Sequence, residues 1–159
     1  MKDIDRKILL HLLKDSKQPV IEIAKKLGVT RQTVAKKIES FKNDGTIEAF
    51  TARLDPKKFG LAIKAYILLR EEPDVELRRK NEKIIRQFPH ATEFYRIFGR
   101  YSAVLELLVR DEGELSKIVK RIHRLKGVRE TETLIVHSTI KNVPESPFVR
   151  LLSSAKKFT

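Results

Sequence analysis

The stretch VIEIAKKLGVTRQTVAKKIESFKNDG, residues 20–45, decides the fold of the amino-terminal part of this 159-residue chain. Apolar residues recur at helical spacing before Gly28 and again after Thr30, and Gly45 ends the second series. Glycine is favoured just after the last residue of a helix, and threonine is favoured just before the first residue of the next. The stretch therefore predicts two short helices joined by a tight turn, which is a helix-turn-helix.

Outward from this stretch, the first 54 residues are predicted to form one small domain. Ile4, Ile8 and Leu12 recur at helical spacing and predict a helix that precedes the pair. Residues 46–54, TIEAFTARL, have the composition of a strand and are expected to form a wing. We therefore predict a winged helix-turn-helix over residues 1–54.

The remaining chain has a different periodicity and predicts a second domain over residues 62–141. Residues 55–61, DPKKFGL, combine proline, glycine and charge and are expected to be a linker. Strand-like runs begin near residues 62, 91, 102 and 128, and helical patterns lie between the first and second runs and between the third and fourth. This order is that of a βαββαβ ferredoxin-like domain, so the fold class is α+β. Residues 142–159 form a tail with Pro144 and Pro147, which we expect to fray or to pack on a neighbouring subunit.

The predicted second domain has an uncovered surface. Both of its helices must lie on one face of its sheet, so the other face needs a partner, and a homodimer is the simplest solution.

The composition favours an anionic partner. Lys and Arg outnumber Asp and Glu by 34 to 21, which gives a formal charge of +13, and residues 1–60 carry 14 basic and 8 acidic side chains. Nucleic acid gains affinity when cationic side chains neutralise its phosphates, so double-stranded DNA is the leading candidate. The charge by itself is also compatible with a solvated cationic surface that binds nothing.

Several other classes of protein are disfavoured. The chain has no cysteine, and its four histidines are far apart in sequence, so neither a disulfide scaffold nor a metal site is expected. No nucleophile elbow or glycine-rich phosphate loop is present, and we expect no catalytic residues and no cofactor. No run approaches the roughly 18 apolar residues of a membrane span, so we expect a cytoplasmic protein without a membrane partner. Glu71 and Glu72 are expected to face water at a strand end, with magnesium binding as the alternative.

The second helix of the predicted pair has a face suited to DNA. Val34, Ile38 and Phe41 are spaced to pack inward, which turns Gln32 and Lys36 outward. Glutamine can bind the edge of adenine, and arginine and lysine can bind guanine or phosphate in the major groove. The predicted DNA-contacting residues are Arg31, Gln32, Thr33, Lys36, Lys37 and Ser40. The alternative is an ordinary solvated amphipathic helix, but the preceding helix, the turn and the net charge favour DNA.

Several short motifs in order resemble the Lrp/AsnC family of feast/famine transcription regulators. They are IDRKIL at residues 4–9, IAKKLGVT at 23–30, DGTI at 44–47 and TARLDPKKFG at 51–60, and the resemblance extends to about residue 141. In that family an amino-terminal helix-turn-helix binds DNA. A βαββαβ domain forms homodimers, usually assembled further into octamers, and senses amino acids. The resemblance thus implies DNA and an amino-acid effector as partners, and it places the DNA-contacting residues at the positions given above.

The resemblance also places an effector loop between the second and third strands. The family pattern is Gly, then Asp or Asn, then an aromatic residue, then Asp. Here the loop reads Gly99, Arg100, Tyr101 and Ser102, and we use "effector loop" for these four residues. Arg100 favours a ligand carboxylate or phosphate, and no loop carboxylate remains to pair with an ammonium group. The loop therefore predicts either an acidic ligand, such as glutamate or aspartate, or no amino-acid effector.

Two further possibilities concern this loop. Glu130 and Glu132 on the last strand are the nearest candidates to supply the missing carboxylate. Alternatively, Gly99 permits a tight hairpin, Tyr101 packs in an interface, and no small molecule binds. The sequence leaves these possibilities open.

The sequence as a whole predicts a sequence-specific DNA-binding transcription regulator that is not an enzyme. The alternative is a small-molecule sensor of amino-acid metabolism that acts through protein contacts. The two hypotheses differ in salt dependence, since phosphate contacts make duplex affinity fall steeply as salt rises.

Overall fold

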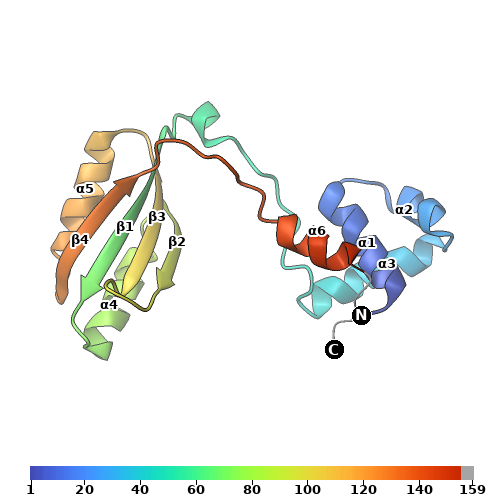
Figure 1. Ribbon diagram of the computed structural model, residues 1–159, viewed down its shortest axis with the longest axis horizontal. Coiled ribbons are helices and arrows are strands. Elements are labelled where there is room, and N and C mark those ends of the chain that lie inside the picture. Colours follow the sequence, from blue (N-terminus) through green and yellow to red (C-terminus); the bar gives the residue numbers. More distant parts are fainter. Residues whose placement is uncertain (155–159) are drawn as a thin grey trace. The chain divides into compact units, whose positions relative to one another are not determined.

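The structure is a computed structural model, and it describes residues 1–154 (Figure 1). The chain forms two compact units, one from residues 1–53 together with the segment that begins at Lys141, and one from residues 54–140. Each unit has its own hydrophobic core.

The first unit contains the predicted helix-turn-helix. Its helices are α1 (Asp3–Lys14), α2 (Val20–Leu27), α3 (Arg31–Asn43) and α6 (Ser146–Ser153). Ile8, Ile23 and Val34 are fully buried between the first three helices. Gly28 ends α2 with φ +66°, a left-handed conformation that suits glycine, and the Thr30 hydroxyl accepts the Thr33 N–H at 3.1 Å to cap α3. The sequence thus predicted the end of α2 and the start of α3 correctly.

The strand predicted over residues 46–54 is wrong. Thr46 and Ile47 form a bend, and residues 48–54 have no regular secondary structure. The Ile47 N–H donates a hydrogen bond to the Phe41 carbonyl at 2.8 Å, which holds the start of this segment against α3. A strand needs a neighbouring strand to bind its backbone groups, and none of the described residues of this unit supplies one.

The expectation that the tail frays is also wrong for residues 146–153, which form α6 on the surface of α1. Leu152 is 7% exposed within the core of the first unit, and the Arg6 side chain donates to the Leu152 carbonyl at 3.1 Å. Pro147 lies in the first turn of α6, where its missing N–H costs nothing. Arg53 holds the preceding residues, with its guanidinium 3.1 Å from the Asn142 side chain and 3.2 Å from Glu145.

The second unit is the predicted βαββαβ domain. Its elements are β1 (Ile63–Glu71), α4 (Val75–Ile85), β2 (Ala91–Arg96), β3 (Ala103–Val109), α5 (Glu112–His123) and β4 (Val128–Ile135), and a short 3₁₀ helix (Pro56–Phe59) lies in the expected linker. The sheet order is β2-β3-β1-β4, and every neighbouring pair is antiparallel.

Both helices of this unit lie on the same face of the sheet (Figure 1). Alternate residues of β1 and β3, such as Ile67 and Leu105, are completely buried beneath α4 and α5. Asp111 begins α5 by accepting the Glu114 N–H at 2.8 Å, and the Glu114 carboxylate accepts the Arg110 N–H at 2.7 Å. The helices thus leave the other face uncovered, as the sequence predicted.

We call the uncovered side the open face. It carries the intervening residues of the strands, namely Lys64, Tyr66, Leu68, Arg70, Val104, Glu106, Leu108, Glu130, Glu132 and Leu134. Leu134 is 46% exposed, whereas Glu106 is largely covered by its partners. Its carboxylate accepts the Tyr66 hydroxyl at 2.8 Å and the Thr92 hydroxyl at 2.7 Å, and the Lys64 ammonium lies 2.7 Å away. The open face therefore combines apolar side chains with one ordered polar cluster.

Candidate DNA interface and effector loop

The outer face of α3 presents most of the predicted DNA-contacting residues to solvent. The exposed ones are Arg31, Gln32, Thr33, Lys36 and Ser40. Val34 and Phe41 on the opposite side are 0% and 6% exposed and fix the helix to the core. Glu39 lies on the same outer face, but Lys42 binds it at 3.1 Å, so its charge is partly compensated. Polar donors on one exposed helix face match the requirements of a reader of the major groove.

Two of the predicted residues also have partners within the protein. The Thr33 hydroxyl lies 2.8 Å from the Thr30 hydroxyl, at the start of α3. The Lys37 ammonium lies 2.8 Å from the carboxylate of Asp5 on α1, and the Lys37 side chain is about one-third exposed. No sequence pattern relates Asp5 to Lys37, because the two residues lie on different helices.

The effector loop contacts β4 through both glutamates that the sequence singled out. Arg100 binds Glu130 at 3.0 Å, and the Tyr101 hydroxyl donates to Glu132. The hydrogen bond from Tyr101 raises the pKa of that phenol, and the bond to Glu130 raises the pKa of Arg100. Glu130 also lies 3.5 Å from Arg70, the residue opposite it in the register. Arginine and glutamate side chains therefore lie side by side at the loop, and such a pair of charges can bind both the carboxylate and the ammonium of a zwitterion.

Ser102 connects this loop to a buried polar network. Its hydroxyl donates to the Leu69 carbonyl at 3.1 Å and accepts the Glu71 N–H at 3.1 Å. The Glu71 side chain is only 1% exposed, so the expectation that Glu71 faces water is wrong. The Asn81 amide donates to its carboxylate at 3.2 Å, and Arg96 donates to it as well. Glu71 keeps the alternation of β1 and lies on its buried side, like Ile67 and Leu69. The sequence indicated water because of the charge of the residue, and its buried partners lie on other elements.

Arg96 is the central cation of this network, and the sequence analysis missed it. Burial opposes its charge, but hydrogen bonds to Glu71 and Glu82 together outweigh this effect and raise the pKa of Arg96. The bond to Glu82 measures 2.8 Å. An arginine within a strand is not distinguishable by sequence from a solvated one, since its partners come from β1 and α4.

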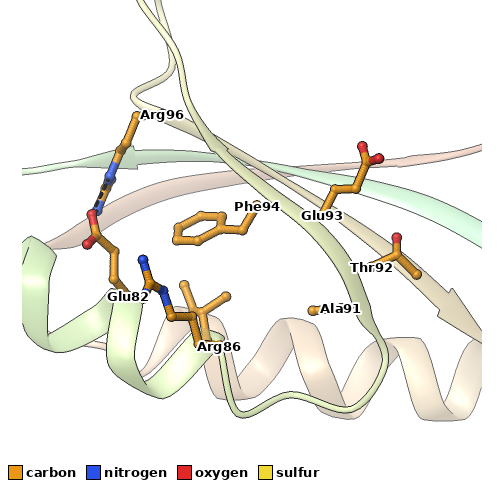
Figure 2. Close-up of a pocket in the computed structure, with 8 residues that line it drawn as sticks. Glu82, Arg86, Ala91, Thr92, Glu93, Phe94 and Arg96 are labelled. Atoms are coloured by element: carbon orange, nitrogen blue, oxygen red, sulfur yellow. Dashed lines mark hydrogen bonds and ion pairs between the residues drawn. The ribbon is translucent and has the colours of Figure 1, made fainter. Parts of the chain in front are cut away.

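Two hollows border this network. One, of about 460 Å³, lies between α4 and the edge strand β2, and Figure 2 shows Phe94 and Arg86 beside the pair formed by Arg96 and Glu82. The other, of about 450 Å³, is lined by Arg70, Glu71, Glu72, Pro73, Arg129 and Glu130. Because Glu130 also binds Arg100, the second hollow adjoins the effector loop.

Within residues 1–154, no group of three histidine, aspartate or glutamate side chains could hold a metal ion. The same residues contain no helix with the length and apolar content needed to cross a membrane.

The fold and these two sites define a two-domain DNA-binding regulator with a ligand-binding domain. Residues 1–48 match the family model of a winged helix-turn-helix DNA-binding domain, and residues 64–145 match that of the Lrp/AsnC ligand binding domain. The chain belongs to the Lrp/AsnC family of transcription regulators, as the motifs in its sequence indicated.

Relatives and solved structures agree with this assignment. The HTH-type transcriptional regulator FL11 of Pyrococcus horikoshii is 31% identical over 147 residues, which cover 91% of this chain and 95% of the relative. The crystal structure of an AsnC family transcriptional regulator from Agrobacterium tumefaciens has a TM-score of 0.81 at 28% identity and covers 89% of this chain and 94% of the other. A regulator from Neisseria meningitidis, solved as a complex with L-methionine, has the same fold, with a TM-score of 0.83 at 18% identity over 89% of this chain and 93% of the other.

Proposed function

We propose that this regulator acts in the cytoplasm as a homodimer, without a catalytic step, and that α3 reads its operator in the major groove. The proposed DNA-contacting residues are Arg31, Gln32, Thr33, Lys36 and Ser40. The observation that carries the proposal is the exposed polar face of α3, held to the core by its opposite side. A two-fold dimer would place two such helices about one DNA turn, roughly 34–36 Å, apart or at a multiple of that spacing.

The experiment is an in vitro selection of duplexes from a random library with the full chain. We expect enriched inverted repeats whose half-sites are separated by about one helical turn or a multiple of it. The logarithm of the association constant for the selected duplex should fall linearly with the logarithm of the salt concentration, with a slope of about −0.9 per phosphate neutralised. No enrichment, together with no salt-dependent duplex binding, would contradict the proposal and favour a sensor that acts through protein contacts.

The dimer is proposed to form through the open face. Leu68, Val104 and Leu134 give this face an apolar centre, and burial of such side chains is the usual driving force of association. Light scattering should therefore give at least the mass of a dimer for the full chain. Leu134→Arg should lower that mass, whereas Val75→Arg, at a 60% exposed position on α4 outside the open face, should not. Octamers are the larger assembly to look for in the same measurement.

We further propose that Gly99, Arg100, Tyr101 and Ser102 form the sensing site together with residues of β4. Glu132 supports an extension of the sequence hypothesis, because it offers the carboxylate that the loop itself lacks. An α-amino acid has one ammonium and one carboxylate group, and Glu132 and Arg100 offer one partner for each. The ligand class therefore includes neutral amino acids besides the acidic ones. The relative solved with L-methionine binds a ligand of this neutral class.

Calorimetric titration of the full chain tests the sensing site, with glutamate, aspartate, leucine, methionine and lysine as ligands. We expect at least one to bind, and Glu132→Gln to weaken it about tenfold or more, because an ammonium group would lose its charged partner. Glu76→Gln is the matched control, since Glu76 pairs with Arg79 within α4 and lines neither hollow. No binding of any of the five, or equal binding by the Glu132 variant, would overturn this assignment.

A further inference from the structure

Asp5 is a buried carboxylate in the DNA-binding unit. The residue is 8% exposed and lies in the first turn of α1. One of its oxygens, Oδ2, accepts the Lys2 N–H at 3.2 Å. The other, Oδ1, accepts no hydrogen bond of good geometry from the described residues, but it forms an ion pair with the Lys37 ammonium of α3, 2.8 Å away. Lys37 is thus the charge that compensates this buried oxygen, and without it the oxygen would remain desolvated and unpaired.

Lys37 lies on the side of α3 that faces away from Gln32. Successive residues of a helix are about 100° apart, so Lys37 lies about 140° from Gln32 and only about 40° from Phe41. Phe41 is 6% exposed, whereas Gln32 is exposed. Lys37 therefore stands at the edge of the buried side of the helix, and its ammonium is directed towards α1.

We propose that Lys37 is a positioning residue, which with Asp5 fixes the rotation of α3 about its axis so that Gln32 and its neighbours meet the base edges. The sequence analysis placed Lys37 among the DNA-contacting residues, which is a different role. This inference rests on the proposed function of α3 as the DNA-reading helix.

The physical reason is that base readout tolerates less displacement than phosphate contact. A helix with its side chains has a radius of about 5–6 Å, so a rotation of about 20° moves a side-chain tip by about 2 Å. A hydrogen bond to a base edge is lost over such a distance, since donor and acceptor must stay within about 2.7–3.2 Å. Long lysine and arginine side chains can follow a phosphate through the same movement. Loss of the ion pair should therefore reduce discrimination between sequences more than it reduces general affinity.

The test compares a selected duplex with a random duplex of equal length, by fluorescence anisotropy at several salt concentrations. The variants of the full chain are Lys37→Met, Asp5→Asn and the double variant. We expect each single variant to lower the ratio of the two affinities about tenfold, with little change in the salt slope. The double variant should resemble either single variant, because all three lack the same ion pair.

Asp5→Asn separates the two roles of Lys37. If Lys37 contacted phosphate, removal of Asp5 would free its ammonium, and binding to both duplexes would become tighter. Loss of a phosphate contact in Lys37→Met would weaken binding to both duplexes alike, and it would reduce the slope of log affinity against log salt by about 0.9. Either result would overturn the proposal. Failure of the unaltered chain to bind any duplex would instead contradict the proposed function itself.

Two more variants test whether the effect is specific to the ion pair between Lys37 and Asp5. Lys37→Arg keeps a cation that can reach Asp5 and should retain the native ratio of affinities. Lys7→Met removes an exposed ion pair of the same kind, in which Lys7 lies 2.7 Å from Asp3, and should also retain it. Thermal unfolding by circular dichroism identifies any variant that is not folded at the assay temperature. If folded Lys37→Met and Asp5→Asn both keep the native ratio, the ion pair does not position α3.

Discussion

Removal of the Leu152 side chain tests whether α6 is a structural part of the DNA-binding unit. Leu152→Ala deletes three carbons from a side chain that is 7% exposed and packed in the core with α1. At about 0.8 kcal/mol per buried carbon group, and with partial collapse of a terminal helix, the cost is about 2–3 kcal/mol. A unit of this size loses roughly 4–8 °C of melting temperature per kcal/mol, so its transition should fall by roughly 10–20 °C.

The assay is differential scanning calorimetry of the full chain, together with hydrogen exchange measured on peptides of α1 and β1. Exchange in α1 should accelerate in the variant because α6 covers that helix, whereas exchange in β1 should not change. Leu151→Ala is the matched control, since Leu151 is 46% exposed and its truncation should cost little. Equal effects from Leu151→Ala and Leu152→Ala, or unchanged exchange in α1, would refute the reasoning that the buried side of α6 stabilises this unit.

Three other predictions concern the DNA interface, the start of α5 and the segment before α6. Gln32→Ala should relax the preference at one base position, at a cost of about 1–3 kcal/mol on the selected site and little on random duplexes, and repeating the selection with the variant would reveal it. The Arg110 backbone N–H and side chain lower the pKa of Glu114 from 4.5 to about 2, so Glu114 stabilises the folded chain above pH 4.5, and this contribution is lost as the pH falls towards 2. Urea unfolding of Glu114→Gln should accordingly depend less on pH in that window; an unchanged pH profile would count against the assignment. Arg53→Ala removes an exposed pair, so stability should change by less than about 1 kcal/mol, while hydrogen exchange should accelerate at residues 142–145; unchanged exchange there would show that Arg53 does not hold this segment.

The sequence identified two carboxylates near residues 99–102 and the exposed side of α3, whereas it did not predict how the side chains pair. Gly99 and Tyr101 matched a family pattern, and Glu130 and Glu132 were singled out as nearby carboxylates. The structure pairs Arg100 with Glu130 and Tyr101 with Glu132. Alternation along a strand is a local property, and this explains why Glu130 and Glu132 could be expected on the same face of β4.

The same local reasoning failed where a side chain turns to another element. Residues 46–54 have strand composition but no strand to pair with, and the tail has two prolines but buries Leu152 in the same core as α1. Glu71 lies on the buried side of β1 and points into a network with Asn81 and Arg96 instead of into water. In each case the outcome depends on a neighbour that lies far away in the sequence.

The amino-acid sequence by itself determined the family, the helix-turn-helix, the order of the βαββαβ unit and the face of α3 that is exposed. These features follow from periodicity, from capping residues and from glycines at helix ends, all of which act over a few residues. Only the tertiary structure decided that α6 belongs to the DNA-binding unit, that Glu71 is buried and that Lys37 pairs with Asp5. Burial and ion pairing depend on distances in space between segments that no local pattern relates, and for this reason these three features became visible only in the folded chain.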